Sequence, residues 1–331
     1  MNIRDHFRIG VWENVKLGRN ATLVALILII GAIVAGPYFI ASRWQHILIM
    51  WCLWSIAGIS WLVILKVGEF SLCSAAFLCI GAYSSSVMTL KLGCPFWPAL
   101  IAGGLISGIF ALALGVVVFR LKGLYFLVIT YLFAEMLRLG ISLTGYLGGG
   151  TGLYGMPEPG NIGFITFSTK QGWFYLSFLL LLITAFTFRR VEASRIGRVY
   201  SYIGMAPDLA ESLGVRIMKY KVQAFVLGGI FTGLAGVVMA HYFTGISPES
   251  FTLYPSLVTQ LVAILGGVPY LVAGPVVGAI IYSAVDEYVA AISGLRPLIV
   301  GVLLVVIIFF MPQGIISRLR QLFGKGREAK S

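Results

Sequence analysis

Long apolar stretches separated by short polar segments make up almost the whole of the chain. About 20 apolar residues in a helix span the hydrocarbon core of a bilayer. The pattern therefore predicts an all-α fold, a polytopic transmembrane helical bundle of about ten membrane segments. The ten stretches are residues 21–40, 46–65, 70–90, 97–118, 124–143, 173–188, 222–243, 255–268, 271–291 and 296–312.

The least certain part of this pattern is the pair of stretches within residues 255–291. They are separated by an uncharged break, GGVPYLVAGP, at residues 266–275. Such a break fits a loop between two full crossings. It also fits a re-entrant turn or a broken helix, because irregular backbone is tolerated at membrane depth where protein or a cavity surrounds it. Ten crossings are expected, with eight or nine as alternatives.

Basic residues predict the orientation, since Lys and Arg accumulate in the cytoplasmic segments of membrane proteins. Residues 1–20 are basic, and we expect a cytoplasmic arm there. Residues 21–316 would form the transmembrane domain, with a cytoplasmic loop at 189–221, and residues 317–331 a basic cytoplasmic tail. The stretch 21–40 is interpreted as a retained helix, because no small-residue cleavage site follows it. The chain is thus expected to be a multi-pass protein of the bacterial inner membrane with both termini cytoplasmic.

The composition excludes a soluble globular domain. Of the 331 residues, 59% are hydrophobic and 11% are charged, whereas a soluble domain carries about 25% charged residues. The net charge of +12 comes from basic residues at the ends of apolar stretches, so we expect membrane lipid and no nucleic acid as a partner. The sequence contains no GxSxG, HExxH or P-loop motif, and its four cysteines follow no metal or disulfide spacing. We therefore expect no catalytic residue, metal site or cofactor.

Ionisable residues within apolar stretches are functional candidates by default. Glu69 stands beside Lys66, and a local ion pair between them is the simplest explanation. Glu135 and Arg138 are three residues apart and can pair on one helix face, either to stabilise the segment or to face a central path. Asp286 and Glu287 lie near the end of their stretch, where solvent exposure would account for them. The isolated deep carboxylate typical of a proton- or sodium-coupled carrier is missing from this sequence.

Glycine spacing predicts close helix packing. Gly104 and Gly108, Gly229 and Gly233, and Gly274 and Gly278 are each four residues apart. Such pairs let helix backbones approach closely in lipid, and packing is the expected role of most of them. A weak internal similarity links residues 108–123 with residues 229–245, as in transporters with duplicated halves.

The polar segment at residues 189–221 separates two long apolar blocks and holds seven basic residues. Residues 207–213 carry the signals of a two-turn helix. Pro207 suits a first turn, and Gly214 supplies a left-handed stop. Leu209 and Leu213 fall on one face, while Asp208 and Glu211 complement the helix dipole. A helix this short is unstable alone. Two interpretations remain: it lies flat on the inner leaflet, or it inserts into a cytoplasmic partner.

Four stretches resemble one family in order and spacing. They are VGEFSLCSAAFLCIGAY at 67–83, FRLKGLYFLVITYLFAE at 119–135, residues 197–251 and LGGVPYLVAGPVVGA at 265–279. Over about residues 40–316 the chain resembles permease subunits of the branched-chain amino acid ABC importer family. It departs from the family at Glu69, Cys73 and Ser74, which stand where Gln, Gly and Gln are usual, and at GMAP, residues 204–207.

The resemblance implies a permease that is not itself an enzyme. Its implied partners are a second homologous permease, two cytoplasmic ATP-binding subunits and an external solute-binding protein. Its implied solute is a branched-chain or related amino acid, with urea, short amides or sugars as alternatives. An ion-coupled secondary carrier and a membrane-embedded enzyme are the other classes considered. Thr130, Tyr131 and Glu135 are candidate pathway residues. The implied ATPase-coupling helix consists of Ala206, Pro207, Asp208, Leu209, Ala210, Glu211, Ser212, Leu213 and Gly214.

Overall fold

The structure is a computed structural model. It describes residues 41–121, 123–160, 167, 169–289, 298, 301–302 and 314–316. The chain divides into two units, Met1–Ser42 and Arg43–Ser331, and the description below concerns the second. The predicted stretch 21–40, most of the stretch 296–312 and the predicted tail 317–331 lie outside the described residues.

Eight helices of the described chain coincide with predicted apolar stretches, which confirms an all-α bundle. Five of them are long and apolar enough to cross a membrane: α2, α4, α5, α6 and α9. The described part of the chain therefore leaves the predicted count of about ten segments open. The helices are α2 (Ser42–Lys66), α3 (Ser74–Leu90), α4 (Phe96–Val118), α5 (Leu124–Leu143), α6 (Lys170–Ala193), α9 (Ile217–Tyr242), α10 (Leu253–Gly266) and α11 (Ala273–Val289).

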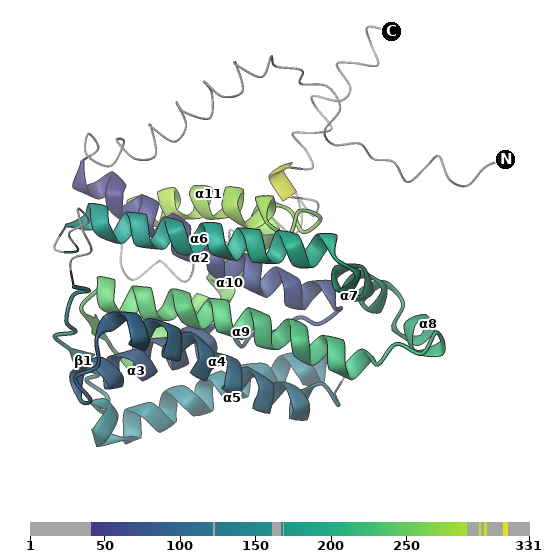
Figure 1. Ribbon diagram of the computed structural model, residues 1–331, viewed down its shortest axis with the longest axis horizontal. Coiled ribbons are helices and arrows are strands. Elements are labelled where there is room, and N and C mark those ends of the chain that lie inside the picture. Colours follow the sequence, from purple (N-terminus) through teal and green to yellow (C-terminus); the bar gives the residue numbers. More distant parts are fainter. Residues whose placement is uncertain are drawn as a thin grey trace, which may run out of the picture. The chain divides into compact units, whose positions relative to one another are not determined.

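The long helices lie roughly side by side, and the polar segments gather at their two ends. Two short helices, α7 (Arg195–Met205) and α8 (Pro207–Ser212), lie beyond one end of α9, on the right in Figure 1. At the other end, β1 (Leu153–Tyr154) pairs antiparallel with β2 (Gly245–Ile246). Two short 3-10 helices, η1 (Gly145–Leu147) and η2 (Pro248–Phe251), belong to the same loops.

Helix α9 packs against α3 and α4, and glycines form these contacts. A Cβ added at Gly104 would lie 2.7 Å from Leu234, and one at Gly108 would lie 2.5 Å from Ile230. A Cβ added at Gly81 would strike the carbonyl of Gly233. The predicted packing role of these glycines is therefore confirmed. The two mutually similar stretches, 108–123 and 229–245, fall largely on the neighbouring helices α4 and α9.

Helices α10 and α11 form an antiparallel pair. The hydroxyl of Tyr254, at the start of α10, lies 2.9 Å from that of Tyr282, near the end of α11. Helix α10 has 14 residues, a length of about 21 Å at 1.5 Å per residue, which is short of the roughly 30 Å hydrocarbon core. A Cβ added at Gly58, in the middle of α2, would lie 3.0 Å from Pro275 and 3.1 Å from Val262. The turn between α10 and α11 is therefore close to the middle of α2.

Glu287 is only partly exposed to solvent, and it also has a charged partner. Its side chain is 23% exposed, and its carboxylate accepts a 3.1 Å bond from the Nε of Arg43. The Asp286 carboxylate lies 3.5 Å from the Tyr254 hydroxyl. Both carboxylates thus join the end of α11 to the starts of its neighbours α2 and α10.

Candidate functional site

Helix α7 is amphipathic and anchored at both ends. The Ser194 hydroxyl accepts bonds from the backbone N–H groups of Ile196, at 3.2 Å, and Gly197, at 3.4 Å, which caps the helix. Tyr200 and Ile203 are each 1% exposed and form its inner face. Burial raises the pKa of the Tyr200 phenol, so this side chain stays neutral. The inner face of α7 thus fixes the position of the segment that follows.

Helix α8 confirms the short helix that the sequence predicts at residues 207–213, with its last helical residue at Ser212. Gly214 adopts a φ of +80°, the left-handed conformation expected of a glycine stop. Its N–H donates to the Glu211 carbonyl at 2.9 Å, and the Val215 N–H donates to the Ala210 carbonyl at 3.1 Å. Both ends of α8 therefore have the backbone geometry that the sequence indicates.

Helices α7 and α8, together with the residue that follows α8, carry four exposed apolar side chains. Tyr202 is 62% exposed, Met205 84%, Leu209 62% and Leu213 76%. Large apolar side chains exposed together mark a contact surface. We call these four residues the α7–α8 apolar surface. Asp208 and Glu211 on α8 are also exposed.

The acidic residues bear on the two interpretations of α8. A helix lying on the anionic inner leaflet gains from basic side chains, and carboxylates beside its apolar face oppose that binding. Exposed Asp208 and Glu211 flank Leu209 and Leu213. The same loop also exposes the basic residues Arg195, Arg198, Arg216 and Lys219, so its charges suit an anionic leaflet as well as a protein partner.

Between α2 and α3 the backbone leaves the helical conformation over residues 67–73, here called the interhelix segment. Side chains from other helices satisfy its backbone groups. The Trp61 indole N–H donates to the Ser71 carbonyl at 2.8 Å, and the Ser256 hydroxyl donates to the Leu72 carbonyl at 2.8 Å. The Leu72 N–H donates to the Thr130 hydroxyl at 3.1 Å. Such bonding is what irregular backbone within a membrane domain requires.

Alternate residues of the interhelix segment point in opposite directions, as in an extended strand. Glu69, Ser71 and Cys73 are buried. Phe70 is 37% exposed, and Leu72 is half-buried. The segment thus has an inner face that is fixed to the bundle and an outer face that is open.

Two ion pairs link the interhelix segment and its flank to the polar loop, and they correct the sequence interpretation. Lys66 does not pair with Glu69. The Lys66 ammonium instead contacts Glu192 at the end of α6, and Glu69 contacts Lys221 in the first turns of α9. The side chains of Glu69 and Lys221 are 7% and 15% exposed. The two pairs therefore hold both ends of the loop that contains α7 and α8.

A backbone contact joins the middle of the same loop to the interhelix segment. A Cβ added at Gly204, in the last turn of α7, would strike the Lys66 carbonyl, and one at Gly68 would lie 3.2 Å from the Gly204 Cα. Gly68 has a φ of +85°, which side-chain-bearing residues rarely adopt. Glycine is therefore required at both positions for α7 to reach the start of the interhelix segment.

The three candidate pathway residues occupy different environments on α5. Thr130 is fully buried, and its hydroxyl donates to the Leu127 carbonyl at 2.8 Å in addition to its bond with Leu72. Tyr131 is half-buried. The predicted pairing of Glu135 with Arg138 is present, with the Arg138 Nε 3.0 Å and 3.1 Å from the two carboxylate oxygens. The arrangement makes Thr130 a support for the interhelix segment and leaves Tyr131 and the ion pair at the surface of α5.

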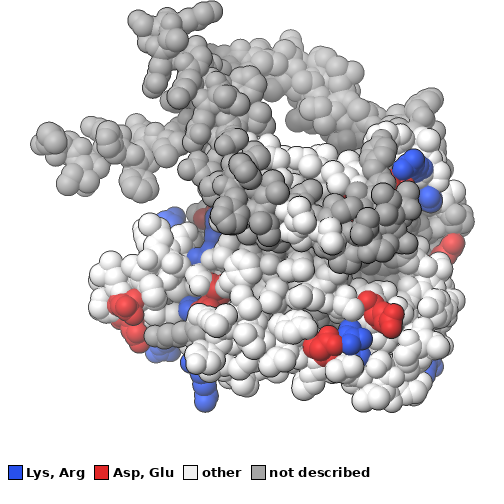
Figure 2. Space-filling view, turned by 180° about the vertical axis from the view of Figure 1, so that it is seen from behind, with Lys and Arg blue, Asp and Glu red and all other residues white. Residues whose placement is uncertain are grey.

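The surface of α5 is otherwise apolar and widely exposed. The exposed apolar side chains of this helix are Leu124, Tyr125, Val128, Leu132, Met136, Leu139 and Leu143. On the face drawn in Figure 2, white atoms make up most of the surface outside the grey region, and the charged side chains form separate groups, one of them well inside the face. Such a surface suits lipid or a second membrane subunit.

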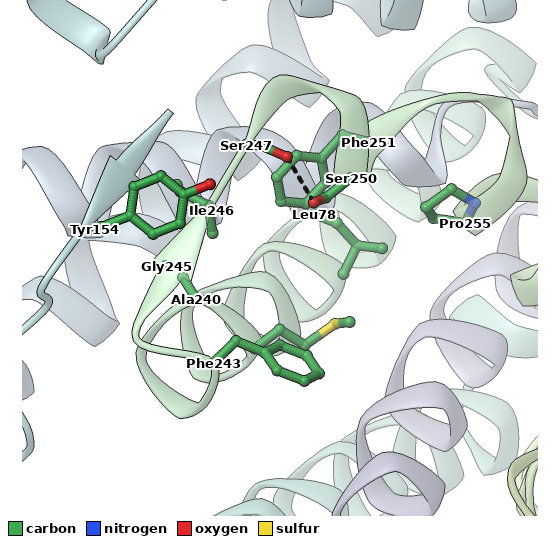
Figure 3. A pocket seen from close by; sticks show the side chains of 11 residues that line it. Leu78, Tyr154, Ala240, Phe243, Gly245, Ile246, Ser247, Ser250, Phe251 and Pro255 are labelled. Atoms are coloured by element: carbon green, nitrogen blue, oxygen red, sulfur yellow. Dashed lines mark hydrogen bonds between the residues drawn. The ribbon is translucent and has the colours of Figure 1, made fainter. Parts of the chain in front are cut away.

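A cavity of about 380 Å³ lies at the end of the bundle that holds β1 and β2. Figure 3 shows the Tyr154 and Phe251 rings among its lining side chains, with the hydroxyls of Ser247 and Ser250 bonded to each other at 3.1 Å. Its lining includes no charged residue. Its side chains therefore offer a solute apolar surface and hydroxyl groups.

The described residues provide no metal or nucleophile site. No group of three His, Cys, Asp or Glu residues among them is arranged to hold a metal ion. Cys52, Cys73 and Cys79 are free, buried thiols. His241 is fully buried, with its ring 4.9 Å from that of Phe96.

Sequence reasoning missed the interhelix segment and the residues that hold it. Trp61, Ser256 and Gln260 received no role, yet each bonds the backbone of Ser71 or Leu72. One local signal was present: a glycine follows the basic end of α2 in KVGEF. The partners come from 10, 184 and 189 residues away in the chain, so no local pattern could have identified them.

Comparison with known proteins adds a sequence relationship. The sequence model of the family described as "Branched-chain amino acid transport system / permease component" matches residues 44–311. Two relatives carry the name "High-affinity branched-chain amino acid transport system permease protein LivM". The one from Salmonella typhimurium is 28% identical over 333 residues, which cover 93% of this chain and 77% of the relative. The one from Escherichia coli is 27% identical over 322 residues, covering 90% and 75%. No solved structure matches the chain.

Proposed function

The chain belongs to the family of permease components of branched-chain amino acid transport systems, and we propose that it transports branched-chain or related amino acids as the membrane subunit of an ATP-driven ABC importer. The single observation that carries the mechanism is the α7–α8 apolar surface. It combines four exposed apolar side chains with two carboxylates at one end of an apolar bundle.

In this proposal residues 206–214 form the coupling helix that docks into a cytoplasmic ATP-binding subunit. Leu209 and Leu213 would enter an apolar pocket of that subunit, while Asp208 and Glu211 would meet its polar rim. ATP hydrolysis takes place on the partner, so this chain is not an enzyme. We infer two such subunits, because a permease pair would present two α7–α8 apolar surfaces.

The exposed side of α5 supports a second, homologous permease as the neighbour in the membrane. Only 22% of the most apolar 18-residue stretch of α5 is buried within this chain. The solute path would run between the two permeases, past Tyr131 and Glu135 on α5, with Thr130 acting indirectly through the interhelix segment. An external solute-binding protein would deliver the solute at the end that holds β1 and β2.

The same arrangement suggests a membrane topology. Residues 1–20, the loop 189–221 and residues 317–331 would be cytoplasmic. The α10–α11 pair would be a re-entrant hairpin, because α10 is too short to cross and its turn lies near the middle of α2. Eight crossings then remain, from the stretches 21–40 and 296–312, the helices α2, α4, α5, α6 and α9, and α3 together with the interhelix segment. An even number keeps both termini on one side.

Two alternatives are less well supported. An ion-coupled carrier needs a free carboxylate in its path, whereas Glu135 is bonded to Arg138. A permease for urea, short amides or sugars is suggested by the departures at Glu69, Cys73 and Ser74. Measuring whether urea, short amides or sugars inhibit leucine uptake distinguishes these solutes from amino acids as substrates.

The coupling role is tested with Leu213→Asp in the complete importer, reconstituted with its ATP-binding subunits, second permease and binding protein. A charge in an apolar docking pocket costs about 2 kcal/mol or more, so we expect leucine uptake to fall more than about tenfold. ATP hydrolysis should no longer respond to the loaded binding protein. Leu213→Met is the matched control and should retain uptake. Full uptake by a normally assembled Leu213→Asp importer would overturn the coupling role.

A further inference from the structure

We propose that the interhelix segment is the element through which the cytoplasmic loop moves the solute path, with Phe70 and Leu72 as the side chains that meet the aliphatic part of the solute. This inference rests on the proposed function and extends it to residues outside the coupling helix and α5.

The contacts with the loop come from both its ends and its middle. Glu192 precedes α7 and contacts Lys66. Gly204 lies in the last turn of α7 and packs on Lys66 and Gly68. Lys221 follows α8 and contacts Glu69. The loop therefore contacts three closely spaced positions, residues 66, 68 and 69. A displacement of α7 and α8 by a docked partner would therefore act directly on the interhelix segment, as well as on α6 and α9, which flank the loop in the chain.

The interhelix segment can shift without unwinding a helix. Its carbonyl and N–H groups at Ser71 and Leu72 bond to side chains of α2, α5 and α10, and α3 begins directly after it at Ser74. A short non-helical stretch between two helices is the usual place where a hinge absorbs a change in backbone angles. Motion at Gly68 would therefore be passed to the first turn of α3.

The open face of the interhelix segment carries two apolar side chains, those of Phe70 and Leu72. Leu72 is bonded through its N–H to Thr130 of α5. The Phe70 ring lies edge-on to the Trp61 ring, with 5.1 Å between the centroids, and the same indole bonds the Ser71 carbonyl. Trp61 thus fixes both the backbone and the ring of the segment. An apolar surface of this kind suits the side chain of an aliphatic amino acid.

The test measures thiol accessibility in the complete reconstituted importer. The background carries Cys94→Ser, which removes the half-buried cysteine and leaves three buried ones. Phe70→Cys and Leu72→Cys should react with a small hydrophilic maleimide, and leucine with its binding protein should protect them. The reaction rate should change by about fivefold or more between nucleotide-free and vanadate-trapped complexes. Ser71→Cys, on the buried face, is the control and should stay unreactive.

A second arm tests the link to the loop. Gly204→Ala places a methyl group against the Lys66 carbonyl, whereas Gly150→Ala meets nothing within 4 Å. We expect Gly204→Ala to abolish the nucleotide dependence of Phe70→Cys labelling and Gly150→Ala to preserve it. If Gly204→Ala does not assemble, Glu192→Gln removes the pair with Lys66 without adding an atom, and it should reduce the same response.

The outcomes separate this inference from the proposed function. Leucine uptake by the unmutated importer is measured first, and failure to take up any aliphatic amino acid would overturn the proposed function. Uptake combined with labelling of Phe70→Cys that is the same in both nucleotide states would overturn only the present inference. Equal nucleotide responses in the Gly204→Ala, Glu192→Gln and Gly150→Ala backgrounds would also overturn it.

Discussion

At the scale of single residues, Glu69 shows how much a buried charge depends on one partner. Its carboxylate and the Lys221 ammonium are both largely shielded from solvent. Taking an ion out of water costs several kcal/mol, and only a well-placed opposite charge offsets this. Glu69 is thus held in place by Lys221 from the far side of the loop that contains α7 and α8, and the neighbour in sequence, Lys66, is held by Glu192.

Removing one partner of the Glu69–Lys221 pair should lower the free energy of unfolding more than removing both partners. We expect Glu69→Ala to lower the free energy of unfolding by about 3–5 kcal/mol, because Lys221 is left buried and unpaired. Thermal unfolding of the purified chain in detergent measures the loss. The double variant Glu69→Gln with Lys221→Met should recover much of it. Equal losses in the single and double variants would show that the pair does not behave as a buried ion pair.

At the scale of helices, glycine sets the distance between α3, α4 and α9. Gly236 lies against the backbone of Leu78, and Gly233 lies against the side chain of Ser107. Lipid offers no hydrophobic driving force for association, so close van der Waals contact supplies most of the attraction between membrane helices. A side chain at these positions would push the helices apart and lose that contact along their length.

Gly236→Val tests this packing. A Cβ at Gly236 would strike the Leu78 carbonyl, and overpacking of a tight contact costs about 1–3 kcal/mol or more. We expect a lower unfolding temperature in detergent and less protein inserted in the membrane. Gly140→Val on α5 is the control, because a Cβ there meets nothing within 4 Å. Similar losses in both variants would assign the effect to helix propensity instead of helix packing.

At the scale of the whole molecule, the α10–α11 hairpin decides how the chain crosses the membrane. Two full crossings would bring the turn at residues 267–272 to the cytoplasmic surface. A re-entrant hairpin would keep it within the membrane domain, at the depth at which Gly58 of α2 meets Pro275.

The hairpin is tested by labelling from the cytoplasmic side in inverted vesicles. Pro269 is exposed in this chain, so Pro269→Cys reports on its surroundings. Maleimides react with the thiolate, which does not form in an apolar medium. We therefore expect Pro269→Cys to react far more slowly than Arg195→Cys, an exposed position of the loop that we propose to be cytoplasmic. Equal rates would favour two full crossings.

The sequence by itself determined those features that depend on neighbouring residues. Runs of apolar residues fixed where α2 to α6 and α9 lie, Pro207 and Gly214 bounded α8, and glycines four residues apart marked the packed faces. Hydrophobicity, helix capping and helix periodicity depend on residues close together in the sequence, so the sequence alone is enough to recognise them. The family that the four sequence stretches resemble is the one whose sequence model matches residues 44–311.

Only the tertiary structure decided the features that join distant parts of the chain. It paired Lys66 with Glu192 and Glu69 with Lys221 in place of the local pair, and it assigned Thr130 to the backbone of Leu72. It also placed Gly204 on Gly68. The physical reason is that a buried charge or an unpaired carbonyl takes whichever partner the packed helices bring within reach, and spacing along the sequence does not encode that choice.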